Sequence, residues 1–182
     1  ARPAWPAGLR LLHGPSRTHC VAAVYGARGL PKMDTFGSVD GYVRFTLGDQ
    51  ELRTKVKANT YTPEWDQLFC AEVGPRHRSG VAGLVFLVYD SDTFKKDDYI
   101  GQVTLPWGDA DGRILELPIR GGKEPGHEDG SSQGFLRLQV APAEAVLADF
   151  EQGMALSEAY AEELEQISRT VAARRGGGGG GG

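Results

Sequence analysis

The feature that most constrains this chain is a series of short β-rich runs at regular spacing between residues 18 and 140. Clusters of Gly, Pro and Asp, which favour turns, separate one run from the next. Leu136, Leu138 and Val140 alternate with polar residues, as in a strand with one buried face. Short strands at this spacing predict an all-β sandwich. The eight expected strands are His19–Tyr25, Gly41–Leu47, Glu51–Lys57, Gln67–Val73, Gly83–Tyr89, Tyr99–Leu105, Arg113–Leu117 and Gly134–Val140.

The pattern changes from strand to helix after Pro142. Residues 143–175 contain no Pro and one Gly, and they are rich in Ala, Glu and Leu. We expect an amphipathic helix over 142–175, with its polar face mainly acidic, so that anionic lipid repels it. A protein partner through 143–175, or the rest of the chain, is the expected contact of its apolar stripe, and packing on its own sandwich is the alternative. That stripe comprises Phe150, Met154, Tyr160, Leu164, Ile167 and Val171.

The remaining segments set the expected domain limits. Residues 1–17 are an irregular lead-in, 18–141 the sandwich, and 176–182 a flexible glycine tail. The chain begins at Ala1, and we expect a piece of a longer protein. No apolar run approaches the roughly 18–20 residues of a membrane span.

Composition and motifs narrow the functional classes. The net charge of −4 does not favour a nucleic-acid binder, which is usually strongly basic. The sequence contains no nucleophile-elbow, Walker A or His-Glu-x-x-His motif, so we do not expect an enzyme. Strand parity places Cys20 and Cys70 on opposite faces, which predicts no disulfide and indicates a reducing, cytoplasmic compartment.

Aspartates gather in two segments, 30–42 and 88–101, that each lie between apolar strand runs. Taken singly, an aspartate in a loop is commonly a turn former, and Asp97 is expected to be a solvated turn residue. Several carboxylates at one end of a sandwich repel one another, and a hard cation removes that repulsion. Calcium accepts about six to eight oxygens from a flexible shell, which suits such loops. The five candidate ligands are Asp34, Asp40, Asp90, Asp92 and Asp98.

The spacing within these segments matches a known pattern. The first reads Leu-x-x-x-Asp-x-x-x-x-x-Asp-x-Tyr from Leu30, and the second reads Tyr-Asp-x-Asp-x-x-x-x-x-Asp-x-Ile-Gly from Tyr89. Thr62-Pro-Glu-Trp65 lies between them. In these motifs residues 18–140 resemble the C2 domain, a β-sandwich that binds calcium and phospholipid. The departures are Gly41 in place of Pro and Thr62 in place of Asn, neither of them a ligand position.

The resemblance implies an eight-stranded antiparallel C2-type sandwich. It favours the phospholipase C and perforin type of topology, which begins at Thr18–Tyr25 and closes with Gly134–Val140. If Leu9–Leu12 forms a paired first strand, the synaptotagmin-type permutation holds instead. The resemblance also implies two to three Ca²⁺ ions, held by the five aspartates together with backbone carbonyls of Met33, Ser91 and Lys96.

Lipid contacts are expected at the same end. Phe36 and Phe94 occupy the centres of the two acidic loops and have no strand core to fill, so they are candidates for insertion into lipid, or for packing back onto their loops. Lys95 and Lys96 flank Phe94 and would meet anionic headgroups. The resemblance adds a concave basic face that binds a phosphoinositide, whose alternative is an ordinary solvated sheet face. Its candidate residues are Arg44, Arg53 and Lys55.

Together these features predict a calcium-dependent phospholipid-binding module of a larger protein, which is peripheral to the membrane when calcium binds. The alternatives are a scaffold in which calcium is structural or vestigial, the regulatory domain of a phospholipase-type enzyme, and the targeting domain of a pore-forming protein. The aspartate set separates the first two, because a pure scaffold has no need for five.

Overall fold

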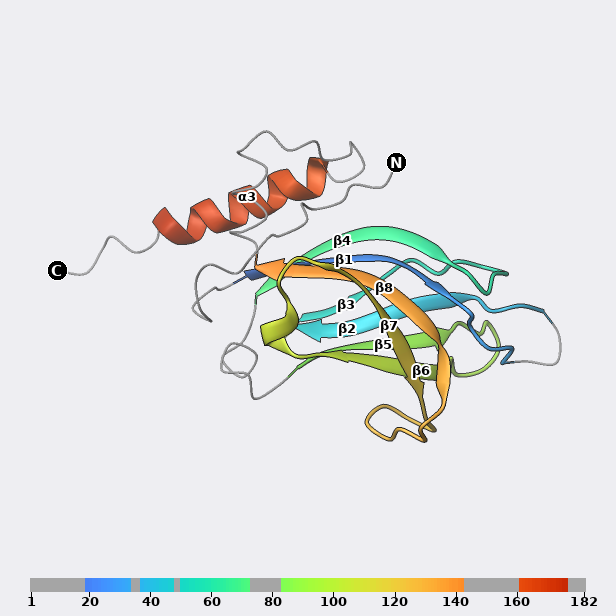
Figure 1. Cartoon of the computed structure of the whole chain (residues 1–182). Coiled ribbons are helices and arrows are strands. Elements are labelled where there is room, and N and C mark those ends of the chain that lie inside the picture. The colour runs from blue at the N-terminus through green and yellow to red at the C-terminus, as the bar shows by residue number, and fades with distance from the viewer. Residues whose placement is uncertain (1–18, 34–36, 48–49, 73–82, 143–160, 177–182) are drawn as a thin grey trace.

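The computed structural model describes residues 19–33, 37–47, 50–72, 83–142 and 161–176 (Figure 1). All eight expected strands are present within these ranges, with a short 3₁₀ helix η1 (Trp107–Asp109) and an α-helix. The strands are β1 (His19–Arg28), β2 (Gly41–Leu47), β3 (Gln50–Arg53), β4 (Glu64–Glu72), β5 (Leu84–Asp90), β6 (Asp98–Leu105), β7 (Ile114–Gly121) and β8 (Ser132–Pro142).

The strands pair in the order β3-β2-β5-β6-β7-β8-β1-β4, and every pairing is antiparallel. They form two layers, because β6 and β7 pair only at Gly101 with Gly121 and at Gln102 with Arg120. In Figure 1 the layer with β4, β1 and β8 runs over the layer with β2 and β5. The predicted antiparallel sandwich is confirmed.

The last strand decides between the two topologies. β8 lies between β7 and β1, and β1 has β4 on its other side, so both edges of both strands are taken. A preceding strand from Leu9–Leu12, which lies outside the described residues, has no free position beside β1. The phospholipase C type of strand order is therefore the one that the chain adopts.

The core fills the space between the layers and fixes the strand faces. Phe45 of β2 and Phe86 of β5 are fully buried, with ring centroids 4.9 Å apart, and Phe69 meets Phe45 edge-on at 5.2 Å. Burial of one such side chain contributes about 1.5–3 kcal/mol. A one-residue register slip would move this set to the solvent face, so the core also fixes where each strand ends and each loop begins.

The α-helix, α3 (Ala161–Gly176), covers the end of the helix predicted over 142–175; residues 143–160 lie outside the described part. It lies against β4 and buries Ile167, whereas Glu165 and Arg169 are exposed (Figure 1). Ile167, a residue of the predicted apolar stripe, is thus buried in a helix that lies beside β4. Among the described residues, no helix is long and apolar enough to cross a membrane.

The β1–β4 register bears on the two cysteines. Cys20 pairs with Ala71 and Val21 pairs with Cys70, so the two cysteines are one position out of step.

Candidate functional site

Three loops meet at one end of the sandwich: residues 29–40 after β1, 54–63 after β3, and 91–97 after β5. The first two are joined by the Thr60 amide, which donates to the Val39 carbonyl at 2.9 Å, and by further backbone bonds. The first and third are joined by the Ser91 amide, which donates to the Asp40 carbonyl at 2.9 Å. The two acidic segments, about fifty residues apart in sequence, are therefore neighbours in the fold.

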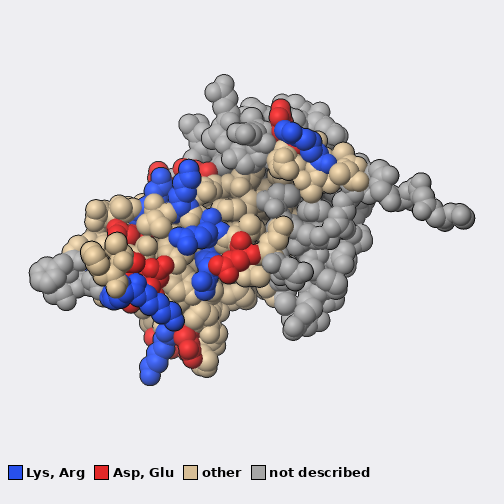
Figure 2. Space-filling view, turned by 180° about the vertical axis from the view of Figure 1, so that it is seen from behind, with Lys and Arg blue, Asp and Glu red and all other residues tan. Residues whose placement is uncertain are grey.

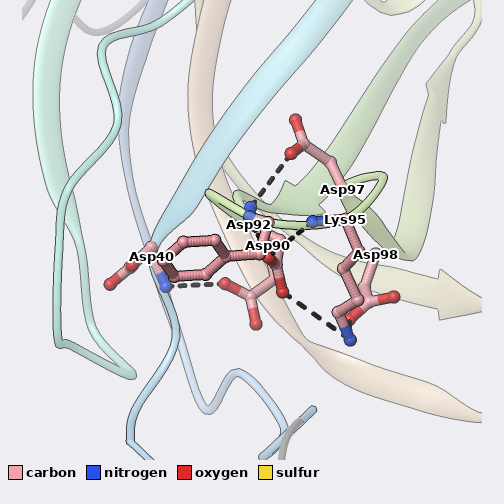
Figure 3. A network of polar contacts seen from close by, with 7 residues as sticks. Asp40, Asp90, Asp92, Lys95, Asp97 and Asp98 are labelled. Carbon is pink, nitrogen blue, oxygen red and sulfur yellow. Dashed lines mark hydrogen bonds and ion pairs between the residues drawn. The ribbon is translucent and has the colours of Figure 1, made fainter.

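Asp40 and Asp90 lie at this junction, just before β2 and at the end of β5. Asp90 is 6% exposed, and its Oδ1 accepts the Asp40 amide at 2.8 Å (Figure 3). Asp40 Oδ1 accepts the Asn59 amide at 2.7 Å, and Asn59 has φ 55°, a left-handed conformation that Asn tolerates well. Backbone amides thus fix both carboxylates in place.

Asp92 shapes the tip of the third loop. Its Oδ1 accepts the amides of Phe94 at 2.8 Å and Lys95 at 3.0 Å, which makes the local turn that Asp favours. The Phe94 amide is the main cause that lowers the pKa of Asp92, and contacts with Lys95 add to it. The carboxylate is therefore held in its anionic form.

The ammonium group of the Lys95 side chain lies between Asp92 and Asp98. The Lys95 ammonium is 3.0 Å from Asp98 Oδ2 and 3.7 Å from Asp92 Oδ2 (Figure 3). Two of the carboxylates predicted to be calcium ligands therefore share a positive group supplied by the chain itself. From the sequence, Lys95 was predicted to meet lipid headgroups only.

Asp97 is not the solvated turn residue that was expected from the sequence. It is half-buried; its Oδ1 accepts the Asp92 amide at 3.0 Å and its Oδ2 accepts the Tyr42 hydroxyl at 2.5 Å. The Asp92 amide, followed by the Tyr42 hydroxyl, lowers the pKa of Asp97. Burial, followed by the bond to Asp97, raises the pKa of Tyr42 to about 12. Asp97 therefore anchors the third loop to β2.

The carboxylate oxygens at this end are of the type that binds a hard cation, although they do not surround a metal position. Among the described residues, no three acidic, His or Cys side chains form a group that could hold a metal ion, and Asp34 lies outside them. The donors are oxygens only, which is the set that calcium prefers. The Lys95 ammonium stands in for such a cation between two of them. On this evidence the residues fit calcium.

The remaining predicted ligands lie in the same two loops. Met33 is half-buried and its side chain packs against the core, while Ser91 follows β5 directly and Lys96 is exposed at the loop tip. Only their backbone carbonyls were predicted to bind calcium, and that role stays a prediction.

The loop tip carries an exposed aromatic side chain. Phe94 is 98% exposed, so it does not pack back onto its loop. Lys96 beside it is also exposed. Phe36, the second predicted insertion residue, lies outside the described residues.

The predicted basic face is built on β2 and β3. Arg44 and Arg53 are cross-strand partners; Arg53 lies 4.4 Å above the Tyr42 ring, and Arg44 lies 4.8 Å above Tyr89 and donates to its hydroxyl at 3.0 Å. The two tyrosine rings stack with centroids 5.6 Å apart. Like charges on facing positions repel. The rings hold the guanidinium groups in fixed places despite that repulsion.

Lys55 belongs to this surface but not to a strand. A strand was expected over Glu51–Lys57, whereas β3 ends at Arg53. The Lys55 amide donates to Gln67 Oε1, a β4 side chain, at 2.6 Å, and the segment pairs with β2 again at the isolated bridge between Lys57 and Gly41. The Lys55 side chain is exposed. Figure 2 shows that basic and acidic side chains alternate over the described surface seen from behind.

These features define the class of the protein. Residues 19–120 match the family model of the C2 domain. Because the match covers more than half of the 182 residues, the chain belongs to the C2 domain family.

Its relatives include synaptotagmins. The chain is 40% identical to synaptotagmin-1 of Aplysia californica over 97 residues, which are 51% of this chain and 22% of that protein. It is 36% identical to human synaptotagmin-5 over 127 residues, which are 68% of this chain and 28% of that protein. The match thus spans between a fifth and a third of the length of these two relatives.

Solved structures share the fold. A C2 domain of plant extended synaptotagmin 1 has a TM-score of 0.54 at 22% identity, and the match covers 69% of this chain and 95% of that chain. A calcium-bound pair of C2 domains from extended synaptotagmin 2 has a TM-score of 0.55 at 21% identity, and the match covers 74% of this chain and 52% of that chain.

Proposed function

We propose that this C2 domain binds anionic phospholipid in response to calcium and so brings a larger protein to a membrane surface. The observation that supports the proposal is the junction of the two acidic loops, where the Asp40 amide meets the Asp90 carboxylate, next to the exposed Phe94. Acidic side chains at the tip repel anionic lipid until a cation neutralises them. The module is proposed to be non-catalytic and peripheral to the membrane.

By the family pattern, two to three calcium ions would be held by aspartates of both loops and by backbone carbonyls. Bound calcium supplies positive charge and coordination positions that lipid phosphate or carboxylate groups complete. Asp40 and Asp90 would offer their carboxylates from fixed places, since backbone amides hold both of them. The proposed ligands are Asp34, Asp40, Asp90, Asp92 and Asp98, with the carbonyls of Met33, Ser91 and Lys96.

The loop tip is proposed to enter the headgroup region. Phe94 is almost wholly exposed, and burial of its ring in lipid would contribute up to about 1.5–3 kcal/mol. Phe36 is proposed to do the same from the first loop. Lys95 and Lys96 would meet anionic headgroups, at about 1 kcal/mol for each charge near the surface.

A second candidate function is phosphoinositide binding on the basic face. Its support is the pair of guanidinium groups, Arg44 and Arg53, that neighbouring tyrosine rings hold on adjacent strands. Guanidinium groups bind phosphate oxygens in a bidentate manner, and preorganised ones lose less entropy when they do so. Lys55 adds a nearby positive charge. This surface needs no calcium.

The scaffold and phospholipase-regulator hypotheses remain the alternatives. The contact of α3 with β4 leaves the rest of 143–175 as the proposed segment for a protein partner. Human group IVD cytosolic phospholipase A2 matches this chain at 20% identity over 17% of its own length, and this likeness concerns only the fold. Neither alternative requires the acidic loops to respond to calcium.

The test is co-sedimentation with phosphatidylcholine vesicles that contain or lack phosphatidylserine, with calcium or with EDTA. We expect binding only with both calcium and phosphatidylserine, and its loss in the Asp90→Asn, Asp92→Asn double variant. Equal binding in calcium and EDTA would contradict calcium dependence. The absence of vesicle binding by a folded wild type would favour the scaffold hypothesis.

A further inference from the structure

We propose that Lys95 is a tethered counter-cation: it competes with calcium for the loop carboxylates, and calcium binding releases it toward the lipid. This inference rests on the proposed function, since it assumes that calcium binds between the two acidic loops. It gives one lysine two opposite effects, one that weakens calcium binding and one that strengthens membrane binding.

The geometry places the ammonium group between two carboxylates. Lys95 Nζ lies 3.0 Å from Asp98 Oδ2 and 3.7 Å from Asp92 Oδ2, while the Lys95 backbone amide donates to Asp92 Oδ1 at 3.0 Å. The turn that Asp92 makes thus positions the residue, and the side chain folds back over the carboxylates (Figure 3). The contact is built from the loop's own sequence.

Calcium and the ammonium group cannot both be bound closely by these oxygens. A divalent ion beside Asp92 and Asp98 would repel a positive charge only a few ångströms away. The Lys95 side chain is 51% exposed, and exposed ion pairs are weak, so the ammonium group can be displaced without a change of fold. Once displaced, it leaves the carboxylates and joins the lipid-facing surface beside Phe94.

Lys96 provides a matched control on the same loop. Its side chain is exposed and makes no ion pair or hydrogen bond with the part of the chain that the structure describes. Replacement of either lysine by Gln removes one positive charge from the loop tip. Only Lys95→Gln also removes a cation from the carboxylates.

The first experiment titrates the wild type, Lys95→Gln and Lys123→Gln with calcium alone, by calorimetry without lipid. Lys123 is an exposed lysine of the β7–β8 connection, outside the acidic loops, so its variant makes the same change in net charge. We expect Lys95→Gln to bind calcium about three- to tenfold more tightly, or to bind one more ion, because two exposed ion pairs no longer compete. We expect Lys123→Gln to stay within about twofold of the wild type. Equal affinities for the two variants would overturn the proposal.

The second experiment measures binding to phosphatidylserine vesicles at saturating calcium. Lys95→Gln and Lys96→Gln should each bind about fivefold more weakly than the wild type, because each lacks one headgroup contact. Opposite shifts in calcium affinity and vesicle affinity are thus expected for Lys95→Gln only. Unchanged vesicle binding by Lys95→Gln would overturn release of the lysine toward lipid.

A third measurement, thermal unfolding in EDTA, involves no calcium. Lys95→Gln should melt about 1–3 °C below Lys96→Gln, since its carboxylates lose their counter-cation. Equal melting would overturn the counter-cation role. If the wild type binds no calcium but Lys95→Gln does, the proposed function fails for the native chain while the competition is supported. If neither binds calcium, both proposals fail.

Discussion

The acidic loop end and the basic face of β2 and β3 handle charge differently. On the strand face, Arg44 and Arg53 repel each other, and tyrosine rings of β2 and β5 hold each guanidinium in place. At the loop end, Asp92 and Asp98 depend on an exposed lysine to offset their repulsion. On the strand face the rings hold the charges in place, and Glu51 lies 3.8 Å from Arg44, whereas the loop end depends on an exposed lysine that we propose to be exchangeable. A binding surface on strands needs no trigger, and one on such loops can respond to an ion.

Tyr42 joins the two regions. Its ring supports Arg53 on the strand face, and its hydroxyl donates to Asp97 of the third loop. Tyr42 thus contacts both regions, and the predictions below test each region separately.

The largest expected effect comes from the double substitution Asp90→Asn, Asp92→Asn. It should abolish stabilisation by calcium, which for a ligand at about 100 times its Kd is about 2.7 kcal/mol. Thermal unfolding with and without calcium measures it. Asp111→Asn is the control, because Asp111 pairs with Arg113 in the β6–β7 connection, away from the acidic loops. A double variant that is still stabilised by calcium would exclude these carboxylates as ligands.

Phe94→Ala tests insertion at the loop end. It should weaken binding to phosphatidylserine vesicles by up to about 1.5–3 kcal/mol, because the ring leaves the headgroup region, while calcium affinity without lipid stays the same. Phe94→Ala should reduce vesicle binding most strongly in high salt. Salt screens the charges but not the insertion of the ring. Wild-type binding that vanishes completely in high salt would contradict insertion.

The substitutions Arg44→Gln and Arg53→Gln together test the strand face. They should weaken binding to phosphoinositide vesicles in EDTA by roughly 2 kcal/mol, at about 1 kcal/mol for each charge. Calcium affinity should not change. Arg113→Gln removes a charge that Asp111 already pairs, and it should have little effect. If the double variant and Arg113→Gln lose the same affinity, the loss reflects net charge and not this face.

Asp97→Asn should have the smallest effect, at the link between the two regions. The pKa of Tyr42 should fall from about 12 but stay raised, because burial is its larger cause. Ultraviolet titration of tyrosinate measures this change. An unchanged titration would show that Asp97 does not hold the hydroxyl.

The same variant has a defined acid dependence. Because the pKa of Asp97 is lowered in the folded state, its stabilising contribution is full above the ordinary value of about 3.9 and is lost as the pH falls through the lowered value. Asp97→Asn should therefore cost stability at neutral pH and progressively less in acid. Equal losses across the acid range would contradict the lowered pKa.

The strand pattern could be predicted because alternation and turn residues are local signals. The end of β3 could not, since the Lys55 amide bonds Gln67 on another strand. The juxtaposition of Asp40 with Asp90 followed from motif spacing and the fold. The roles of Lys95 and Asp97 depend on side-chain directions within one loop, and spacing does not encode them.

The central claim, that lipid and calcium complete one site, is tested most directly by calorimetric calcium titration with and without phosphatidylserine vesicles. If lipid completes the coordination of calcium, lipid strengthens calcium binding, and calcium strengthens lipid binding by the same factor. The account predicts weak calcium binding alone and markedly tighter binding with the vesicles, with both signals lost in the Asp90→Asn, Asp92→Asn variant. Calcium affinity that is the same with and without the vesicles, or no calcium binding by the wild type, would contradict it.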